Sequence, residues 1–184
     1  LTMEPNTVFW SQPPELPEDD ILWDIQEAGQ ALLGEHGYRQ YETSAYAQPG
    51  RQARHNLNYW TFGDFLGIGA GAHAKLSHAD GRILRSWKTR LPKDYLDPAK
   101  AFRAGEKQLA ADELPFEFLM NVLRLTDGVP AVLFTQRTGL ALDAIAKPRR
   151  DAEARGLLSN DPARLVATPK GQLFLNDLLQ SFLP

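Results

Sequence analysis

An amphipathic segment that runs directly into an alternating one is the strongest constraint on the fold of this chain. Apolar residues recur at helical spacing between residues 19 and 35, at Leu22, Ile25, Ala28, Leu32 and Leu33. Gly37 then ends the predicted helix, and residues 38–43 alternate as a strand does. Residues 1–7 are interpreted as the end of another strand. Strand, helix and strand in this order predict an α/β fold.

The acidic run before this helix, Glu18-Asp19-Asp20, has two interpretations. Two carboxylates side by side can form a catalytic pair, but acids are also routine in the first turn of a helix, where the backbone dipole favours negative charge. We favour the second interpretation, so no catalytic residue is predicted here.

The sequence pattern changes after Asp97-Pro98, which we interpret as a boundary between residues 1–97 and residues 98–184. Before it, residues 83–87 predict a further short strand. Beyond it, most segments have helical spacing and one short strand precedes the last helix, which resembles a winged-helix arrangement. The expected elements are helices at 102–109, 116–123, 130–137 and 142–158, the last of these kinked or split by Pro148, then a strand at 164–168 and a helix that starts at Thr168-Pro169.

Composition excludes several classes of protein. The chain has 184 residues, 43% of them hydrophobic, and a formal net charge of −3, as an ordinary globular protein does. No window of about eighteen apolar residues and no secretory signal pattern is present, so a cytoplasmic location is expected. The absence of cysteine removes disulfides, thiolate zinc sites and any iron–sulfur cluster held by this chain itself. Because Leu1 stands in what is interpreted as a strand end, we expect a fragment of a larger protein.

Basic residues gather between residues 147 and 170, which raises the question of nucleic acid. Asp151, Glu153 and Asp161 lie among them and Asp143 lies just before them, which dilutes their charge. Nucleic-acid-binding domains usually carry a one-sided positive field, and this chain is acidic overall. We therefore expect a solvated charged face and no nucleic-acid partner.

The richest candidate for chemistry is the segment from Arg54 to Trp60. If it is helical, His55 and Tyr59 are four residues apart and share one face, and both imidazole and phenol can ligate haem iron. The alternative is an aromatic cluster whose polar tips only form hydrogen bonds. The glycines of Gly67-Ile68-Gly69-Ala70-Gly71 do not have dinucleotide-binding spacing, and we interpret them as backbone that approaches another group closely.

An ordered series of short motifs resembles the HemW family of haem chaperones, which is related to oxygen-independent coproporphyrinogen III oxidase. The resemblance spans the chain and implies the last part of a partial (β/α) barrel of the radical S-adenosylmethionine type, residues 1–97, followed by the C-terminal domain of the family, residues 98–184. The motifs are Leu1-Thr2-x-Glu4-Pro5-Asn6-Thr7, Tyr41-Glu42-x-Ser44-Ala45-Tyr46-Ala47, His55-Asn56-x-x-Tyr59-Trp60, Gly67-Ile68-Gly69-Ala70-Gly71-Ala72-His73, Leu123-Arg124-Leu125, Arg137-Thr138-Gly139-Leu140, Gly156-Leu157-Leu158 and Thr168-Pro169-x-Gly171-x-x-x-Leu175-Asn176.

The resemblance also implies site residues. His55, Asn56, Tyr59 and Trp60 match a motif associated with haem binding, with His55 as the iron ligand, Tyr59 as second ligand or as donor to a propionate, and Trp60 stacked on the macrocycle. Met3 and His73 align with positions that approach the adenine of S-adenosylmethionine. The [4Fe–4S] cluster of the family is held by a three-cysteine loop that these 184 residues lack, so radical chemistry by this chain alone is not expected.

Three functions remain open at this stage. The first is a haem chaperone that binds haem and delivers it to acceptor proteins, and the His-Asn-x-x-Tyr-Trp motif favours it. The second is a coproporphyrinogen oxidase, for which the longer parent protein would turn over a porphyrinogen. The third is an interaction or lid module in residues 98–184. A barrel cut across its sheet would expose a strand edge, so a homodimer is a further expectation.

Overall fold

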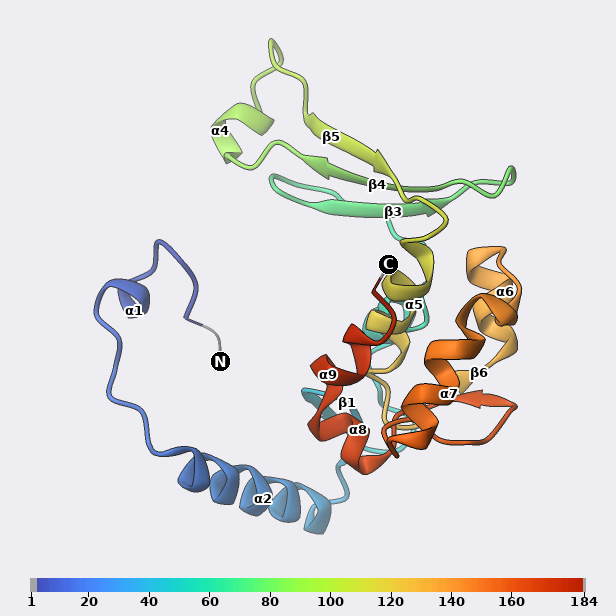
Figure 1. Ribbon diagram of the computed structural model, residues 1–184. Helices are drawn as coiled ribbons and strands as arrows, with labels where there is room; N and C mark the ends of the chain where they lie inside the picture. The colour runs from blue at the N-terminus through green and yellow to red at the C-terminus, as the bar shows by residue number, and fades with distance from the viewer. Residues whose placement is uncertain (1–2, 184) are drawn as a thin grey trace. The chain divides into compact units, whose positions relative to one another are not determined.

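The computed structural model describes residues 3–183 and divides into two compact units, residues 1–39 and residues 40–184. The first unit holds helix α1 (Val8–Ser11) and helix α2 (Asp19–Glu35) (Figure 1). The strand predicted for residues 1–7 is wrong from Met3 onward, while Leu1 and Thr2 lie outside the described residues. The physical reason is local, because the Thr7 hydroxyl accepts a hydrogen bond from the Trp10 backbone N–H and so starts a helical turn.

Helix α2 confirms the amphipathic segment and its helix stop. Asp19 and Asp20 lie in its first turn, as the interpretation of the acidic run expects, although Glu18 at the N-cap makes no side-chain hydrogen bond. Gly37 follows with φ of 77°, a left-handed conformation that glycine adopts without strain. No residue of α2 is buried, and its large apolar side chains stay on the surface of the unit: Ile21, Leu22, Trp23, Ile25 and Leu32.

Strand β1 (Arg39–Glu42) begins at the last residue of the first unit and otherwise belongs to the second. It pairs with β2 (Ala45–Ala47), and helix α3 (Arg54–Trp60) follows. A three-stranded antiparallel sheet follows, made of β3 (His73–Ser77), β4 (Ile83–Lys88) and β5 (Arg103–Gln108), with the short helix α4 (Pro92–Tyr95) between β4 and β5. Figure 1 shows these strands side by side. Strands β1 and β4 confirm the two strands predicted at residues 38–43 and 83–87.

The helix predicted for residues 102–109 is wrong, because this segment forms β5. Its residues pair with β4 in the register Trp87↔Gly105 and Leu84↔Gln108. The missing side chain of Gly105 is what lets the Trp87 ring lie across the sheet, since a Cβ there would overlap the indole. Pairing with a distant strand therefore outweighs the local helical spacing.

The remaining elements are short helices around a two-stranded sheet. They are α5 (Leu114–Val122), β6 (Val129–Pro130), α6 (Val132–Thr138), the 3-10 helix η1 (Leu142–Ile145), α7 (Ala146–Ala154), β7 (Arg164–Leu165), α8 (Pro169–Leu173) and α9 (Leu175–Gln180). The predicted split near Pro148 is confirmed as the change from η1 to α7. The predicted start of the last helix is also confirmed, because the Thr168 hydroxyl accepts from the Gly171 backbone N–H. Helices around the antiparallel pair β6–β7 agree with the winged-helix expectation.

A row of three phenylalanines forms the centre of the core. Phe62 packs edge-on against Phe118 at 5.6 Å between ring centroids, and Phe118 packs in the same way against Phe134 at 5.4 Å. All three rings are almost fully buried. The core therefore joins the segment after α3 to helices α5 and α6. The domain division near residue 98 stays a prediction, and both this core and the β4–β5 pairing cross it.

Within residues 3–183, no helix is long and apolar enough to cross a membrane.

Candidate functional site

Helix α3 presents two different faces, each built from a pair of residues four positions apart. His55 and Tyr59 lie on the exposed face, where their ring centroids are 6.4 Å apart and the planes are nearly perpendicular. The Tyr59 ring also meets Phe65 at 4.3 Å. The helical spacing predicted for His55 and Tyr59 is thus what the structure shows, and both residues are exposed.

The other face of α3 holds the helix in place. The Asn56 amide donates to the Tyr41 hydroxyl at 3.3 Å, which ties α3 to β1. Trp60 is half-buried, and the guanidinium carbon of Arg124 lies 4.3 Å from its ring centroid. Its indole Nε1 is buried and has no hydrogen-bond partner among the residues that the structure describes. The structure therefore brings the four motif residues together but gives them two roles. His55 and Tyr59 lie on the exposed face, whereas Asn56 and Trp60 lie on the face that contacts Tyr41 and Arg124.

A buried ion pair fixes the arginine that covers Trp60. The Glu42 carboxylate accepts from Nε and Nη2 of Arg124 at 3.2 and 2.9 Å, and it also accepts from the backbone and hydroxyl of Ser44. Only 2% of Glu42 is exposed, so these four hydrogen bonds replace the water that the charge has lost. The pair joins residues 82 positions apart in the chain.

Backbone hydrogen bonds reinforce this junction. Thr126 donates from its backbone N–H to the Tyr41 carbonyl and from its hydroxyl to the Gln40 carbonyl. An isolated bridge also pairs Glu42 with Leu125. Strand β1 is therefore attached to the turn after α5 along several residues, and this attachment is what supports the inner face of α3.

Glu42, Arg124 and Tyr41 were not predicted as site residues. Two of the quoted motifs, Tyr41-Glu42-x-Ser44 and Leu123-Arg124-Leu125, contain them, and that coincidence is the signal that was available. Some eighty residues of chain separate the two motifs, so no local pattern predicts that they lie in contact.

The glycine run after α3 makes the close backbone approach that was predicted. A Cβ at Gly67 would overlap the carbonyl group of His73, and the Gly69 backbone N–H donates to the Tyr95 hydroxyl at 3.2 Å. Gly71 has φ of 71° and donates to the Thr89 carbonyl. The group approached in this structure is the protein's own backbone at the start of β3.

The two residues expected near S-adenosylmethionine lie in different units. Met3 is exposed in the first unit, and His73 is exposed at the beginning of β3 in the second. Their proposed contact with adenine stays a prediction. Among residues 3–183 no group of three or more His, Cys, Asp or Glu side chains is placed to hold a metal ion.

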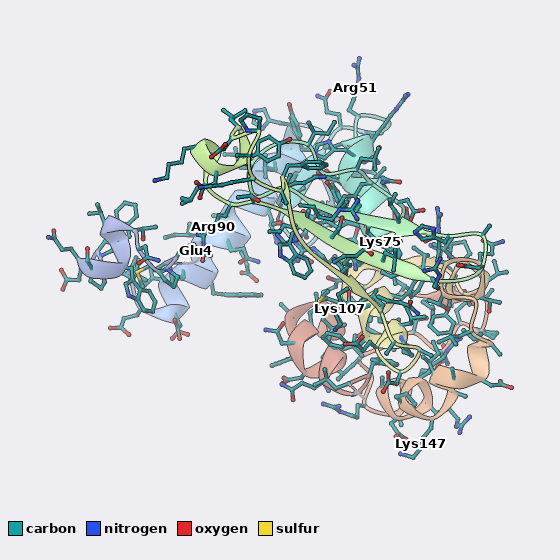
Figure 2. All side chains as sticks on the ribbon, turned by 90° about the horizontal axis from the view of Figure 1, so that it is seen from above. Glu4, Arg51, Lys75, Arg90, Lys107 and Lys147 are labelled. Carbon is teal, nitrogen blue, oxygen red and sulfur yellow. The ribbon has the colours of Figure 1, made fainter. Side chains whose placement is uncertain are left out.

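A buried lysine lies next to α3 on strand β3. Lys75 Nζ donates to Asp64 at 2.9 Å and to the Phe62 carbonyl at 3.1 Å, and Arg85 and Lys107 follow it across the sheet (Figure 2). Burial lowers the pKa of Lys75, and the Asp64 carboxylate opposes that shift. For Asp64, burial alone would raise the pKa, but the hydrogen bonds from Lys75 and Ser77 outweigh burial and lower it. The hydrogen bonds of Lys75 and Asp64 hold β3 against the loop after α3.

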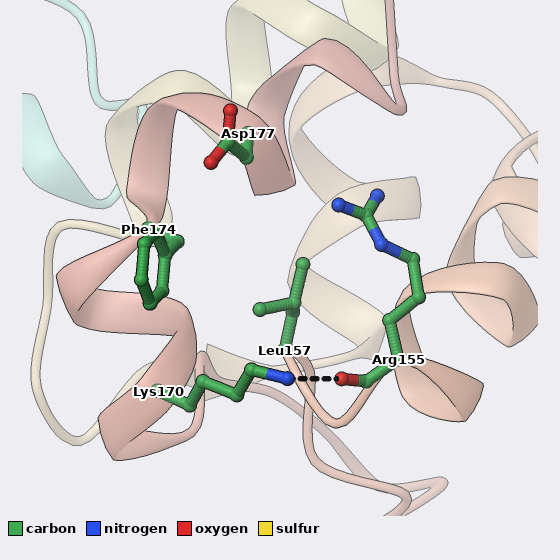
Figure 3. Close-up of a pocket in the computed structure, with 5 residues that line it drawn as sticks. All are labelled: Arg155, Leu157, Lys170, Phe174 and Asp177. Carbon is green, nitrogen blue, oxygen red and sulfur yellow. Dashed lines mark hydrogen bonds between the residues drawn. The ribbon is translucent and has the colours of Figure 1, made fainter.

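Four of the cavities in the second unit are lined by residues outside α3. One of about 390 Å³ lies between the turn after α7 and helices α8 and α9, where Lys170 Nζ donates to the Arg155 carbonyl (Figure 3). Its polar side chains are all exposed. The side of α3 that carries His55 and Tyr59 is an open face, because both residues are exposed.

Residues 109–174 match the HemN C-terminal domain. The chain is 50% identical over 183 residues to the heme chaperone HemW of Escherichia coli (strain K12), covering 100% of this chain and 48% of that protein. It is 48% identical over 183 residues to the heme chaperone HemW of Haemophilus influenzae, with 47% of that protein covered. For HemW of Mycobacterium tuberculosis the identity is 34%, over 91% of this chain and 40% of the relative.

The fold is also that of a solved structure, coproporphyrinogen III oxidase (HemN) from Escherichia coli, described as a radical SAM enzyme. The TM-score is 0.65 at 18% identity, covering 93% of this chain and 43% of that one. The predicted α/β class is confirmed by this match. The chain spans about half the length of the relatives it matches. Along its whole length the chain is similar to the HemW proteins, and residues 109–174 match the HemN C-terminal domain.

Proposed function

We propose that this chain carries the haem-contact helix of a haem chaperone, with His55 as the iron ligand. The observation that carries the proposal is the division of α3 into an exposed His55–Tyr59 face and an anchored Asn56–Trp60 face. An imidazole is a common axial ligand of haem iron. The relatives named heme chaperone HemW, up to 50% identical along the whole chain, support the same function.

The geometry of α3 assigns different roles to the motif residues. Axial ligands approach iron from opposite sides of the macrocycle, whereas His55 and Tyr59 lie side by side on one helix face. One of them can therefore ligate the iron, and the other contacts the ring edge or donates to a propionate. Trp60 has Arg124 over one side of its ring and packs against the core. Its role in this proposal is to fix α3, rather than to stack on the haem.

An exposed ligand also suits transfer. A haem bound on an open face can meet an acceptor protein without prior unfolding of the donor, and its iron can exchange one axial ligand for another. We infer that haem-accepting proteins are the partners of this face and that the transfer takes place in the cytoplasm. The [4Fe–4S] cluster is held, in this proposal, by the part of the longer relatives that this chain does not match. Met3 and His73 are the contacts that this chain makes to the adenine of S-adenosylmethionine.

A haem titration followed in the Soret region tests this proposal. We expect saturable one-to-one binding by the chain, loss or a clear spectral change in His55→Ala, and weaker binding with an unchanged iron spectrum in Tyr59→Phe. His78→Ala is the matched control, because His78 is exposed in the turn between β3 and β4 and lies outside α3. Equal spectra for His55→Ala and His78→Ala would show that the iron ligand is elsewhere.

A further inference from the structure

A second cavity, between helices α5 and α9, carries an inference that does not depend on haem binding by α3. It has a volume of about 430 Å³, within the size range of small-molecule sites. Its walls are apolar, and its polar lining consists of one guanidinium and two carboxamides. The apolar residues are Phe116, Met120, Leu175, Leu179 and Leu183, and the polar ones are Arg124, Asn176 and Gln180.

The polar residues of this cavity have hydrogen-bond donors to spare. Nε and Nη2 of Arg124 donate to Glu42, and Nη2 also donates to Ser44, whereas Nη1 has no partner among residues 3–183. The side chains of Asn176 and Gln180 make no hydrogen bond in the same part of the chain. Both residues are exposed, Asn176 near the start of α9 and Gln180 at its end. A ligand here meets apolar walls and a group of unused donors, so it needs an apolar body and an acceptor.

We propose that this cavity binds an amphiphile with a single carboxylate, whose oxygens accept from Nη1 of Arg124 and from the carboxamides of Asn176 and Gln180. The apolar body lies against Met120 and Leu183, of which 36% and 53% are exposed without a ligand. A carboxylate fits better than a neutral acceptor because hydrogen bonds between charged groups are shorter and about twice as strong.

Binding in this cavity should affect Trp60 of α3, because Arg124 lines the cavity and also lies over the Trp60 ring. The guanidinium that lines the cavity is the one that lies 4.3 Å from the Trp60 ring centroid. A carboxylate drawn to Arg124 therefore changes the electrostatic surroundings of this indole. The emission of Trp60 reports occupancy, and Trp60→Phe identifies its contribution among the four tryptophans of the chain.

The test is a titration of the full chain with decanoate below its micelle concentration, followed by calorimetry and by tryptophan emission. We expect one-to-one binding and a change in emission that is lost in Trp60→Phe. We also expect decan-1-ol to bind at least about tenfold more weakly than decanoate. Two substitutions of opposite charge at Gln180 make the test more specific, because this residue is exposed and can carry either charge. Gln180→Glu should raise the decanoate Kd about tenfold and Gln180→Lys should lower it.

The same substitutions at Gln108 are the matched controls. Gln108 is exposed on β5 and does not line the cavity, so Gln108→Glu and Gln108→Lys should leave the Kd unchanged. The Soret titration should be the same for both Gln180 variants as for the unchanged chain.

Any of five results would overturn the proposal. The first four are the absence of saturable decanoate binding, equal affinity for decanoate and decan-1-ol, equal behaviour of the Gln180 and Gln108 variants, and a dimer in sedimentation that Met120→Glu dissociates. The dimer would show that a second copy of the chain covers the cavity. A Soret titration altered by Gln180→Glu would instead place a haem propionate there and would also overturn the proposal.

Discussion

At the scale of single residues, the Glu42–Arg124 pair decides whether the α3 motif is supported. Glu42 is almost fully buried, and Arg124 covers Trp60, so loss of either partner leaves an unpaired group next to the motif. We expect Glu42→Gln to lower the free energy of unfolding by roughly 3 kcal/mol, because Arg124 keeps its charge and loses its counter-ion. Urea unfolding measures this loss. The matched control is Asp80→Asn, which breaks the exposed pair with Arg82 and should not move the unfolding midpoint. Equal effects of the two substitutions would contradict the buried role of Glu42.

At the scale of elements, the β3–β4–β5 sheet depends on a glycine at one register position. Gly105 pairs with Trp87, and a side chain there would displace the indole. We expect Gly105→Val to lower the free energy of unfolding by about 1–3 kcal/mol, although valine favours strands, because the ring has to move. Thermal unfolding with the near-ultraviolet circular dichroism of tryptophan measures both effects. Gly29→Ala in α2 is the control, since nothing lies near its added methyl group and alanine favours helix by about 0.5–1 kcal/mol. A stabilised Gly105→Val would show that the sheet is not packed in this way.

At the scale of the whole molecule, stability should depend on pH through the Lys75–Asp64 pair. The pKa of Asp64 lies below its usual value of 3.8, so its stabilising contribution is present above that pH and is lost as the pH falls through the lowered pKa. The pKa of Lys75 is lowered by burial, so the cost of its charge decreases as the pH rises toward its usual 10.5. We expect Asp64→Asn to destabilise the chain at pH 7 by about 1–3 kcal/mol and to reduce the loss of stability between pH 5 and pH 2. Urea midpoints across this range measure the effect. Parallel pH curves for both proteins would contradict it.

The sequence by itself determined the elements that depend on neighbouring residues. The spacing in α2, the glycine at position 37, the Thr168 cap and the helical pairing of His55 with Tyr59 all follow from contacts within one turn or two. The same kind of reasoning failed at residues 102–109 and at residues 3–7, where the local pattern was weak. The family resemblance pointed to the four motif residues, and their contact with haem stays a proposal.

Only the tertiary structure decided how the site is supported. The pairing of β5 with β4, the junction of Glu42 with Arg124 and the placement of Arg124 over Trp60 join segments far apart in the chain. Such contacts depend on which surfaces are buried together, and hydrophobic burial is not directional, so no local spacing encodes them. The two faces of α3 became distinct for that reason, since the fold half-buries Asn56 and Trp60 and leaves His55 and Tyr59 exposed.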